Sequence, residues 1–393
     1  MTRGLLSGKM DLDLAPEQQE FVKTVRAFVD DAIRPHAERW DEEHELPMDA
    51  VRQMAELGLF GLPFPEEYGG SGADFLTLCL AIEEIARVDS SLAITLEAAV
   101  GLGAMPVYRF GSEEQKRTWL PPLAAGEALA GFGLTEPGGG SDAGAARTTA
   151  RLDDGTWVVN GSKSFITNSG TPITSFVTVT ALTNDPGEER ETSAIIVPAD
   201  TKGFEVGKPY RKMGWWHSDT HELSFADCRV PEENLLGERG NGFKNFLRIL
   251  EDGRIAIAAL ATGLAQGCVD ECLSYVHERT AFGRPIGSFQ ALQFKLADMA
   301  TKVELARQAY YRAAWLKEQG RPYRKESAMA KLYASEIAVD VARDAVQIHG
   351  GYGYIEEFPV CRHFRDSKIL EIGEGTSEVM RILIARELGL PSA

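Results

Sequence analysis

One glutamate, Glu374, lies between two glycines, Gly373 and Gly375, after a segment of mixed apolar and charged residues. Neither neighbour carries a side chain, so a ligand can approach this carboxylate closely. A carboxylate that is reached in this way can act as a general base. Most glutamates are solvated surface residues, so this run alone is weak evidence for catalysis. Its interpretation depends on segments more than 200 residues upstream.

A glycine-rich loop between Phe132 and Asp142 contains three successive glycines, Gly138 to Gly140, followed by Ser141. Such a run exposes backbone N–H groups that can hold carbonyl oxygens or phosphates. The loop lacks the glycine spacing of a dinucleotide-binding turn and the lysine of a P-loop. From residue chemistry alone, a ligand loop and a plain surface turn are equally compatible with it.

Two further segments carry groups that suit a large planar ligand with phosphates. Phe165 and Thr167 are two residues apart on an expected strand and therefore point to the same side, where they could cover a flat ring. Arg279 and Arg284 surround a turn, and the planar fork of arginine suits phosphate. Ordinary strand packing and a solvated helix end are the simpler alternatives.

The elements that must position these groups fall into three zones. From residue 12 to 128 the pattern is helical, with Pro16 suited to a first helical turn. From 129 to 243 the pattern changes to short strands, such as 156–159 after the turn 153–155, which predicts a mostly antiparallel β domain. From 244 to 393 it is helical again.

The last zone carries a regular apolar seam. Its residues step by three and four, as in a helical bundle: Leu292, Leu296, Met299, Val303, Ala306 and Tyr310. The predicted fold class is therefore a multi-domain α+β protein with an N-terminal α-helical domain, a central antiparallel β-barrel and a C-terminal four-helix bundle.

Composition excludes several classes of protein. The chain has 393 residues, of which 44% are hydrophobic and 25% charged, as in a folded multi-domain protein. The net charge of −17 disfavours a protein that coats nucleic acid or anionic membrane. We find no run of about 18 apolar residues and therefore expect no transmembrane helix. Residues 1–10 lack the apolar core of a secretory signal.

Cysteine and histidine usage points to a reducing compartment without a metal centre. The five cysteines include no Cys-x-x-Cys pair, and Cys268 and Cys272, one helical turn apart, are best interpreted as buried thiols. His217 and His221 lie before a strand rather than on a zinc-binding helix. We expect a cytoplasmic protein with no metal.

Taken together and in this order, these segments resemble the acyl-CoA dehydrogenase family of flavoproteins. The resemblance covers residues 12–389, and its most specific parts are Thr135–Asp142 and Glu374–Thr376. It implies a homotetramer built as a dimer of dimers, acting in fatty acid or amino acid catabolism such as β-oxidation. It also implies FAD as cofactor, an acyl-CoA substrate and an electron-transferring flavoprotein as partner, with no nucleic acid or membrane.

The resemblance assigns roles to individual residues. In the first half of the chain the residues expected at FAD are Phe132, Leu134, Thr135, Gly140, Ser141, Phe165, Ile166 and Thr167. In the second half they are Arg279, Phe282, Phe289, Gln290, Gln347, Gly350, Gly351, Thr376 and Glu378. Of these, Arg279, Phe289, Gln290 and the 347–351 segment would reach FAD from the neighbouring subunit. The acyl-CoA site would include Ser141, Glu251, Arg254 and Gly375.

Glu374 falls where the family keeps its catalytic base. The resemblance implies that Glu374 takes the α-proton of the thioester while flavin N5 takes the β-hydride, which yields trans-2-enoyl-CoA. Burial beside an acyl chain would raise the carboxylate's pKa and make it a better base. Some members place the base near Arg254 instead, but Gly253 occupies that position here.

Three departures from the family pattern affect the expected pocket. Gly373 lies where many members have a bulky residue, Phe165 where tryptophan is common, and Glu251 where aspartate is common. None removes a group that the mechanism needs. The segment 94–100 is expected to form the floor of the acyl pocket, so chain length and branching stay open.

Two alternatives share this fold. A flavin oxidase or monooxygenase would use the same cofactor, although the retained Glu374 disfavours relatives that lack the base. A DNA-associated relative would need a basic C-terminal surface, which the final residues, 386–393, do not supply.

Overall fold

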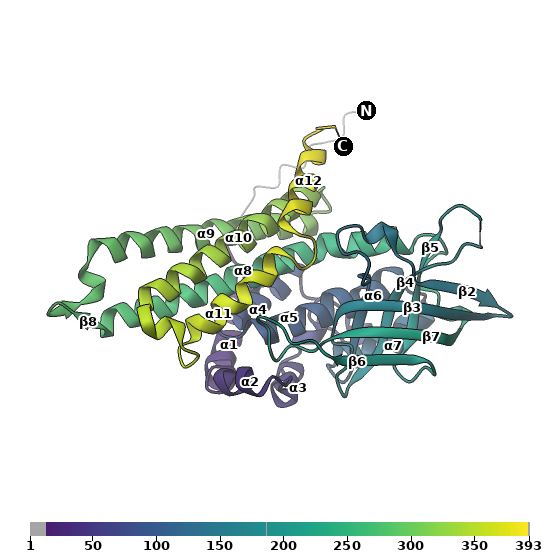
Figure 1. The fold of residues 1–393 in the computed structure, drawn as a ribbon, viewed down its shortest axis with the longest axis horizontal. Helices are drawn as coiled ribbons and strands as arrows, with labels where there is room; N and C mark the ends of the chain where they lie inside the picture. Colours follow the sequence, from purple (N-terminus) through teal and green to yellow (C-terminus); the bar gives the residue numbers. More distant parts are fainter. Residues whose placement is uncertain (1–12, 186, 392–393) are drawn as a thin grey trace.

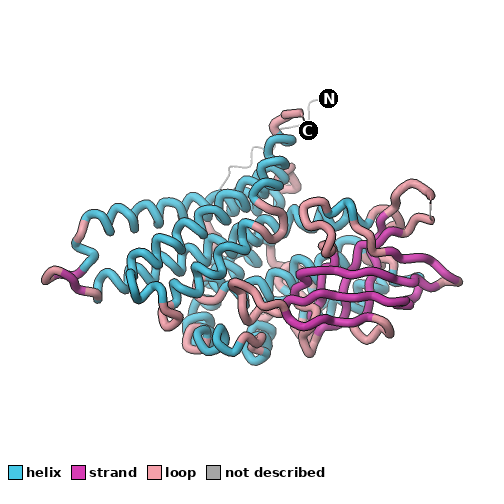
Figure 2. The backbone as a smooth tube through the Cα atoms, viewed as in Figure 1, coloured by secondary structure: helices cyan, strands magenta, loops and turns pink. Residues whose placement is uncertain are grey.

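The computed structural model describes residues 13–185 and 187–391. The expectation about residues 1–10 lies outside them. Helices gather at one end of the molecule and strands at the other, with the small β8–β9 hairpin at the tip farthest from the sheet (Figures 1 and 2). The chain is helical, then stranded, then helical again, as predicted.

The N-terminal region consists of helices with clear sequence signals at their starts. Pro16 opens the first helix, as predicted, and the side chain of Asp89 caps α5 by accepting a hydrogen bond from Leu92 N at 2.9 Å. The helices are α1 (Pro16–Phe28), α2 (Ala37–Glu43), α3 (Met48–Glu56), α4 (Phe75–Ala86), α5 (Ser90–Glu97), α6 (Met105–Phe110) and α7 (Glu113–Ala124). A π-helical segment, Ala98–Ala104, joins α5 to α6.

The middle region is a curled seven-stranded sheet in the order β1-β4-β2-β3-β7-β6, with β5 on β4. Its strands are β1 (Leu129–Gly133), β2 (Thr149–Asp153), β3 (Thr156–Thr167), β4 (Thr174–Leu182), β5 (Thr192–Pro198), β6 (Phe204–Pro209) and β7 (Thr220–Pro231). Side chains from β2, β3, β4, β5 and β7 meet in one core around Trp157. The predicted hairpin is the β2–β3 pair.

The sheet is mostly antiparallel, as predicted, with two parallel exceptions. β1 runs parallel to β4, and β2 meets the end of β4 in parallel at a single pair, Thr149 and Leu182. The remaining pairs of this sheet are antiparallel. Strand direction depends on how the chain enters the sheet, and β1 arrives from a helix rather than through a hairpin.

The C-terminal region is built on three long helices, α8 (Gly242–Glu278), α9 (Gln290–Glu318) and α10 (Arg324–His349), with α8 and α9 joined through β8 (Thr280–Ala281) and β9 (Arg284–Pro285). Two shorter helices, α11 (Pro359–Ser367) and α12 (Ser377–Glu387), contact α10. The predicted α9 seam is buried at Met299, Val303, Ala306 and Tyr310 and partly buried at its first two positions.

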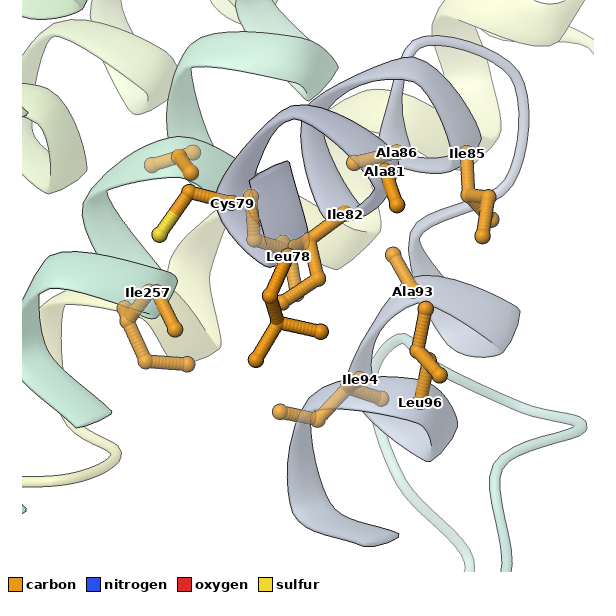
Figure 3. Close-up of a cluster of buried hydrophobic side chains, with 14 of the residues drawn as sticks. Leu78, Cys79, Ala81, Ile82, Ile85, Ala86, Ala93, Ile94, Leu96 and Ile257 are labelled. Atoms are coloured by element: carbon orange, nitrogen blue, oxygen red, sulfur yellow. The ribbon is translucent and has the colours of Figure 1, made fainter. Parts of the chain in front are cut away.

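The two helical regions share one hydrophobic core. Side chains of α4 and α5, among them Leu78, Ile82 and Ile94, gather beside Ile257 of α8 (Figure 3). Each fully buried leucine, isoleucine, valine, phenylalanine or methionine of this core stabilises the fold by about 1.5–3 kcal/mol. The N-terminal and C-terminal helices therefore hold one another in place, and residues far apart in the sequence keep fixed positions around this core.

Two helical stretches, Ser90–Phe110 and α8, are long and apolar enough by composition to cross a membrane. We expected no such stretch, because counting consecutive apolar residues overlooks a window that is apolar on average. These windows are 89% and 83% buried inside the protein, as is usual for core helices. Cys268 and Cys272 are buried on α8, as predicted for structural thiols.

Candidate active site

Glu374 lies in the turn between the 3₁₀ segment Lys368–Glu371 and α12. Its φ of 51° and the φ of 101° at Gly375 are both in the left-handed region. A left-handed glutamate costs of order 1–3 kcal/mol, and such strain gathers at functional sites. The hydroxyl of Thr376 then caps α12 by accepting from Val379 N at 3.2 Å. The turn therefore presents the Glu374 side chain in one fixed direction.

The Glu374 carboxylate points into the protein interior. Both of its oxygens are buried, and neither has a hydrogen-bond partner among the described residues. A Cβ placed on Gly253 of α8 would lie 2.1 Å from Glu374 Oε2. Gly253 is therefore needed to make room for the carboxylate, and the alternative position for a base on α8 is filled by the side chain of Glu374 itself.

Two cations face this carboxylate. Lys331 on α10 donates from Nζ to the carbonyl of Gly375 at 2.6 Å, and burial lowers the pKa of Lys331 to about 8. Arg254 on α8 is buried, burial lowers its pKa, and its Nε and Nη1 have no partner among the described residues. Burial raises the pKa of Glu374, although Glu97, Lys331 and Arg254 oppose the rise.

A second carboxylate, that of Glu97 at the end of α5, faces the same point. The Gly253 Cβ position lies 3.6 Å from Glu97 Oε1, and both oxygens of Glu97 are buried. Burial and the charge of Glu374 raise the pKa of Glu97 well above its ordinary value. Glu97 was not among the residues predicted from the sequence, although one signal pointed to it: it is the lone charged residue between Leu92 and Gly103.

The other residues predicted at the acyl-CoA site are less uniform. Glu251 forms an ion pair with Arg324, Nε to Oε1 at 3.1 Å, and is half-buried beside Arg254. Ser141 is exposed in the glycine-rich loop. Arg254 and Gly375 thus lie with Glu374, whereas Ser141 comes from a different element of the fold.

The glycine-rich loop is held by a buried ion pair that the sequence analysis also missed. Lys163 of β3 donates from Nζ to Glu136 Oε1 at 2.9 Å. The Glu136 carboxylate also accepts from Arg147 N at 2.6 Å and Thr148 N at 3.0 Å. Burial opposes ionisation of Glu136, but these hydrogen bonds outweigh it and lower the pKa to about 2. These hydrogen bonds hold the loop at Glu136, so its glycines need not take part in fixing it.

Aromatic side chains lie on both sides of this loop. Phe132 stacks on Phe246 of α8 with ring centroids 4.0 Å apart. Phe165 has a left-handed φ of 62°, is 66% exposed and lies 5.0 Å from the ring of Tyr210. Leu134 and Ile166 are buried, and Thr135 and Thr167 are half-buried. Ser164 N donates to the carbonyl of Thr135 at 2.9 Å, which places the loop beside the strand that carries Phe165 to Thr167.

A second group of predicted residues lies at the other end of the helices, near β8 (Figure 1). Arg279, Gly350 and Gly351 line a cavity of about 440 Å³ together with His349 and Tyr352. Phe282 is 95% exposed, and Gln290 and Gln347 are exposed. Within one chain this group does not lie with Glu374.

The residues expected at FAD offer the kinds of contact that this cofactor needs. The loop glycines Gly138 and Gly140 have open space around them, which suits close approach of a ligand. An exposed aromatic ring at Phe165 suits a flat ring, and the orphaned Arg254 donors suit an acceptor. The residues present fit the group. Thr376 and Glu378 sit at the start of α12, where the helix N-terminus favours negative charge.

Comparison with known proteins gives a consistent picture. The models for the N-terminal, middle and C-terminal domains of acyl-CoA dehydrogenase match residues 15–127, 131–228 and 240–389. A protein of Bacillus subtilis (strain 168), "Probable acyl-CoA dehydrogenase YngJ", is 52% identical over 96% of this chain and its own full length.

Solved structures agree over nearly the whole chain. One, described as the electron transferring flavoprotein of Acidaminococcus fermentans, matches with a TM-score of 0.93, 46% identity and coverage of 96% of this chain and 99% of the other. Butyryl-CoA dehydrogenase of Megasphaera elsdenii matches with a TM-score of 0.93 and 42% identity, and the match covers 96% of this chain and 100% of the other. A glutaryl-CoA dehydrogenase of Mycobacterium smegmatis in complex with FADH2 matches with a TM-score of 0.91 and 31% identity, and the match covers 97% of this chain and 96% of the other.

Proposed function

This chain belongs to the acyl-CoA dehydrogenase family, and on that premise we propose that it converts an acyl-CoA thioester to the trans-2-enoyl-CoA with Glu374 as base. The observation that carries the proposal is the carboxylate of Glu374, which is buried and has no hydrogen-bond partner among the described residues. Desolvation strengthens a carboxylate as a proton acceptor. A structural glutamate would be paired instead.

The side chains around Glu374 support removal of a proton from carbon. The α-proton of a thioester is weakly acidic, so its acceptor must be both basic and well placed. The left-handed turn fixes Glu374, and Gly253 leaves the space that its carboxylate occupies. Arg254 and Lys331 provide positive charge near the negative charge that develops on the substrate.

FAD is the cofactor that we propose, and when bound it accepts the hydride from the β-carbon. Phe132, Thr135, Phe165 and Thr167 would hold it from this chain. Arg279, Gly350 and Gly351 lie at the far end of the helices, so we propose that a second copy of the chain supplies them to this site. Large exposed apolar side chains at Phe282 and Phe294 support such an assembly.

The number of subunits and the electron acceptor belong to the same proposal. We propose a homotetramer and an electron-transferring flavoprotein as acceptor, which the Acidaminococcus fermentans match supports. Light scattering of the eluted protein tests the tetramer. Oxygen uptake with substrate tests the oxidase alternative, because an oxidase reoxidises without a partner protein. The cytoplasmic location expected from cysteine usage stays a prediction.

Anaerobic titration of the yellow protein with a panel of thioesters tests the reaction. The panel holds one straight short chain, one branched chain, one dicarboxylic and one aromatic acyl-CoA. Bleaching of the flavin band by a panel member, abolished in Glu374→Gln while FAD stays bound, is the expected result. A protein that carries FAD and is bleached by none of them would overturn the proposal.

A further inference from the structure

Two buried carboxyl groups at this site lie close to one point, and neither has a donor among the described residues. All four oxygens of Glu97 and Glu374 are buried and have no hydrogen-bond partner among the described residues. They flank the same point beside Gly253, at 3.6 Å from Glu97 Oε1 and 2.1 Å from Glu374 Oε2. Two buried carboxylates this close repel each other, and a carboxylate can only accept hydrogen bonds. A single proton would remove both difficulties.

The backbone around Glu97 is arranged to admit its carboxyl group. Glu97 ends α5, and the helix continues as a π-helical segment, Ala98–Ala104, a form that often occurs at functional sites. A Cβ on Gly101 would lie 2.9 Å from Glu97 Oε1, so glycine leaves the space that the carboxyl uses. Neighbours on α5 such as Ile94 and Leu96 are apolar and buried (Figure 3).

The surroundings decide which carboxyl keeps the proton. Glu374 faces two cations, Arg254 and Lys331, which favour its charged form. Among the described residues, no cation lowers the pKa of Glu97 in this way: its strongest partner is Glu374, and the thiol of Cys79 on α4 also faces it. Further charged or titratable groups also act on the two cations. They are Glu251, Arg324 and Tyr323 on Arg254, and Glu371 and Glu336 on Lys331.

We propose that Glu97 is a positioning residue for the base: it keeps one proton in the resting site and donates it in a hydrogen bond to the carboxylate of Glu374. The hydrogen bond stabilises Glu374 in its charged form and holds it at one place. An acyl chain that enters this site must replace that contact. The inference rests on the proposed role of Glu374 but makes a claim about the resting protein that does not need turnover.

Infrared spectroscopy of the FAD-bound protein tests the proton directly. The medium is held well above the pKa of Asp366, which burial raises to about 6, so that this buried carboxyl is ionised. The expected wild-type spectrum contains the carbonyl stretch of a protonated carboxylic acid that Glu97→Gln removes. Glu374→Gln shifts this band without removing it, and the exposed control Glu114→Gln changes nothing. A band that persists unchanged in Glu97→Gln would overturn the inference.

The pH dependence of flavin bleaching at thioester concentrations far below saturation reports the pKa of the free protein and gives a second, independent reading. Glu97→Leu removes the donor, so the pKa of Glu374 rises and the acidic limb moves up by about one pH unit. Glu97→Gln keeps a donor and should leave the limb near its wild-type position. Equal limbs in wild type and Glu97→Leu would contradict the inference. Should no thioester bleach the protein, the proposed function fails, whereas the infrared experiment still decides the role of Glu97.

Discussion

Two glutamates buried in this molecule, Glu136 and Glu374, have opposite surroundings. Glu136 accepts hydrogen bonds from Lys163 and from two backbone N–H groups, and its pKa falls to about 2. Glu374 has no donor among the described groups, and its pKa rises. The comparison separates two uses of a buried charge. A carboxylate that is hydrogen-bonded to an ammonium and two backbone N–H groups fixes structure, and one whose sole donor would be the acid proton of Glu97 stays reactive.

The largest effect is expected at Glu374. Glu374→Gln removes the proton acceptor and should slow thioester-driven bleaching by about a thousandfold or more. Its free energy of unfolding should stay the same or rise, because a buried charge disappears. Rapid-mixing absorbance and urea titration measure the two quantities. A variant that keeps a tenth of the wild-type bleaching rate would contradict the role of Glu374 as the proton acceptor.

Glu136→Gln should show the reverse pattern. It leaves the ammonium of Lys163 buried without its partner, which should lower the free energy of unfolding by about 3–5 kcal/mol. Urea titration of the FAD-bound protein measures this. The double variant Glu136→Gln with Lys163→Met removes the stranded charge and should recover part of the loss. If Glu136→Gln is as stable as wild type, the ion pair does not anchor the loop.

Gly253→Ala sharpens the comparison by moving the base without removing it. The new Cβ would lie 2.1 Å from Glu374 Oε2, so the carboxylate must shift. A displacement of about 1 Å can cost on the order of a hundredfold in rate. FAD absorbance should be retained, which separates this effect from misfolding. Wild-type bleaching in this variant would mean that the carboxylate has a second productive position.

On acidification, the activity that depends on Glu374 and the stability that depends on Glu136 should be lost at different pH values. Glu374 has a raised pKa, so bleaching should fade as the pH drops through a midpoint above 4.5. The folded-state pKa of Glu136 is about 2, below its ordinary value of 4.5. Its ionised carboxylate therefore stabilises the fold fully above pH 4.5, and this stability is lost as the pH falls from 4.5 towards 2. Activity should therefore disappear before near-ultraviolet circular dichroism does. Simultaneous loss would contradict this order.

The smallest effect is expected at Gly373. A Cβ there would meet only Ile369 O, at an ordinary 3.5 Å, and its φ is not in the left-handed region. Gly373→Ala should therefore change the bleaching rate by less than about twofold, as is usual for substitutions away from special features. The pair Gly253→Ala and Gly373→Ala thus tests whether contact with the carboxylate, rather than loss of a glycine, causes the effect.

The sequence predicted what local patterns determine. The seam from Met299 to Tyr310 follows helical spacing, and the hairpin at Asp154 and Gly155 follows from turn chemistry. Glu374 was identifiable because its flanking glycines and the family resemblance agree. Glu97 was not, because a single charge in an apolar helix has no periodicity and its partner lies 277 positions away in the chain.

The buried ion pair under the loop was hidden for a related reason. Lys163 and Glu136 occupy a strand and a loop, and only the fold brings them within hydrogen-bond distance. The parallel pairing of β1 with β4 was missed because alternation of apolar residues carries no information about strand direction. In each case the missing knowledge concerned which distant segments meet.

The close contact between Gly253 and Glu374 also bears on how this site can change over generations. The space beside α8 holds one carboxylate, so a base that arises at position 253 collides with the one already at 374. Moving the base from the turn to the helix takes two substitutions, and either one alone passes through a crowded or an empty site. The position of the base is thus protected by a fitness barrier, steric on one route and caused by loss of the base on the other, and a Gly253→Glu, Glu374→Gly pair made together would cross it in a single step.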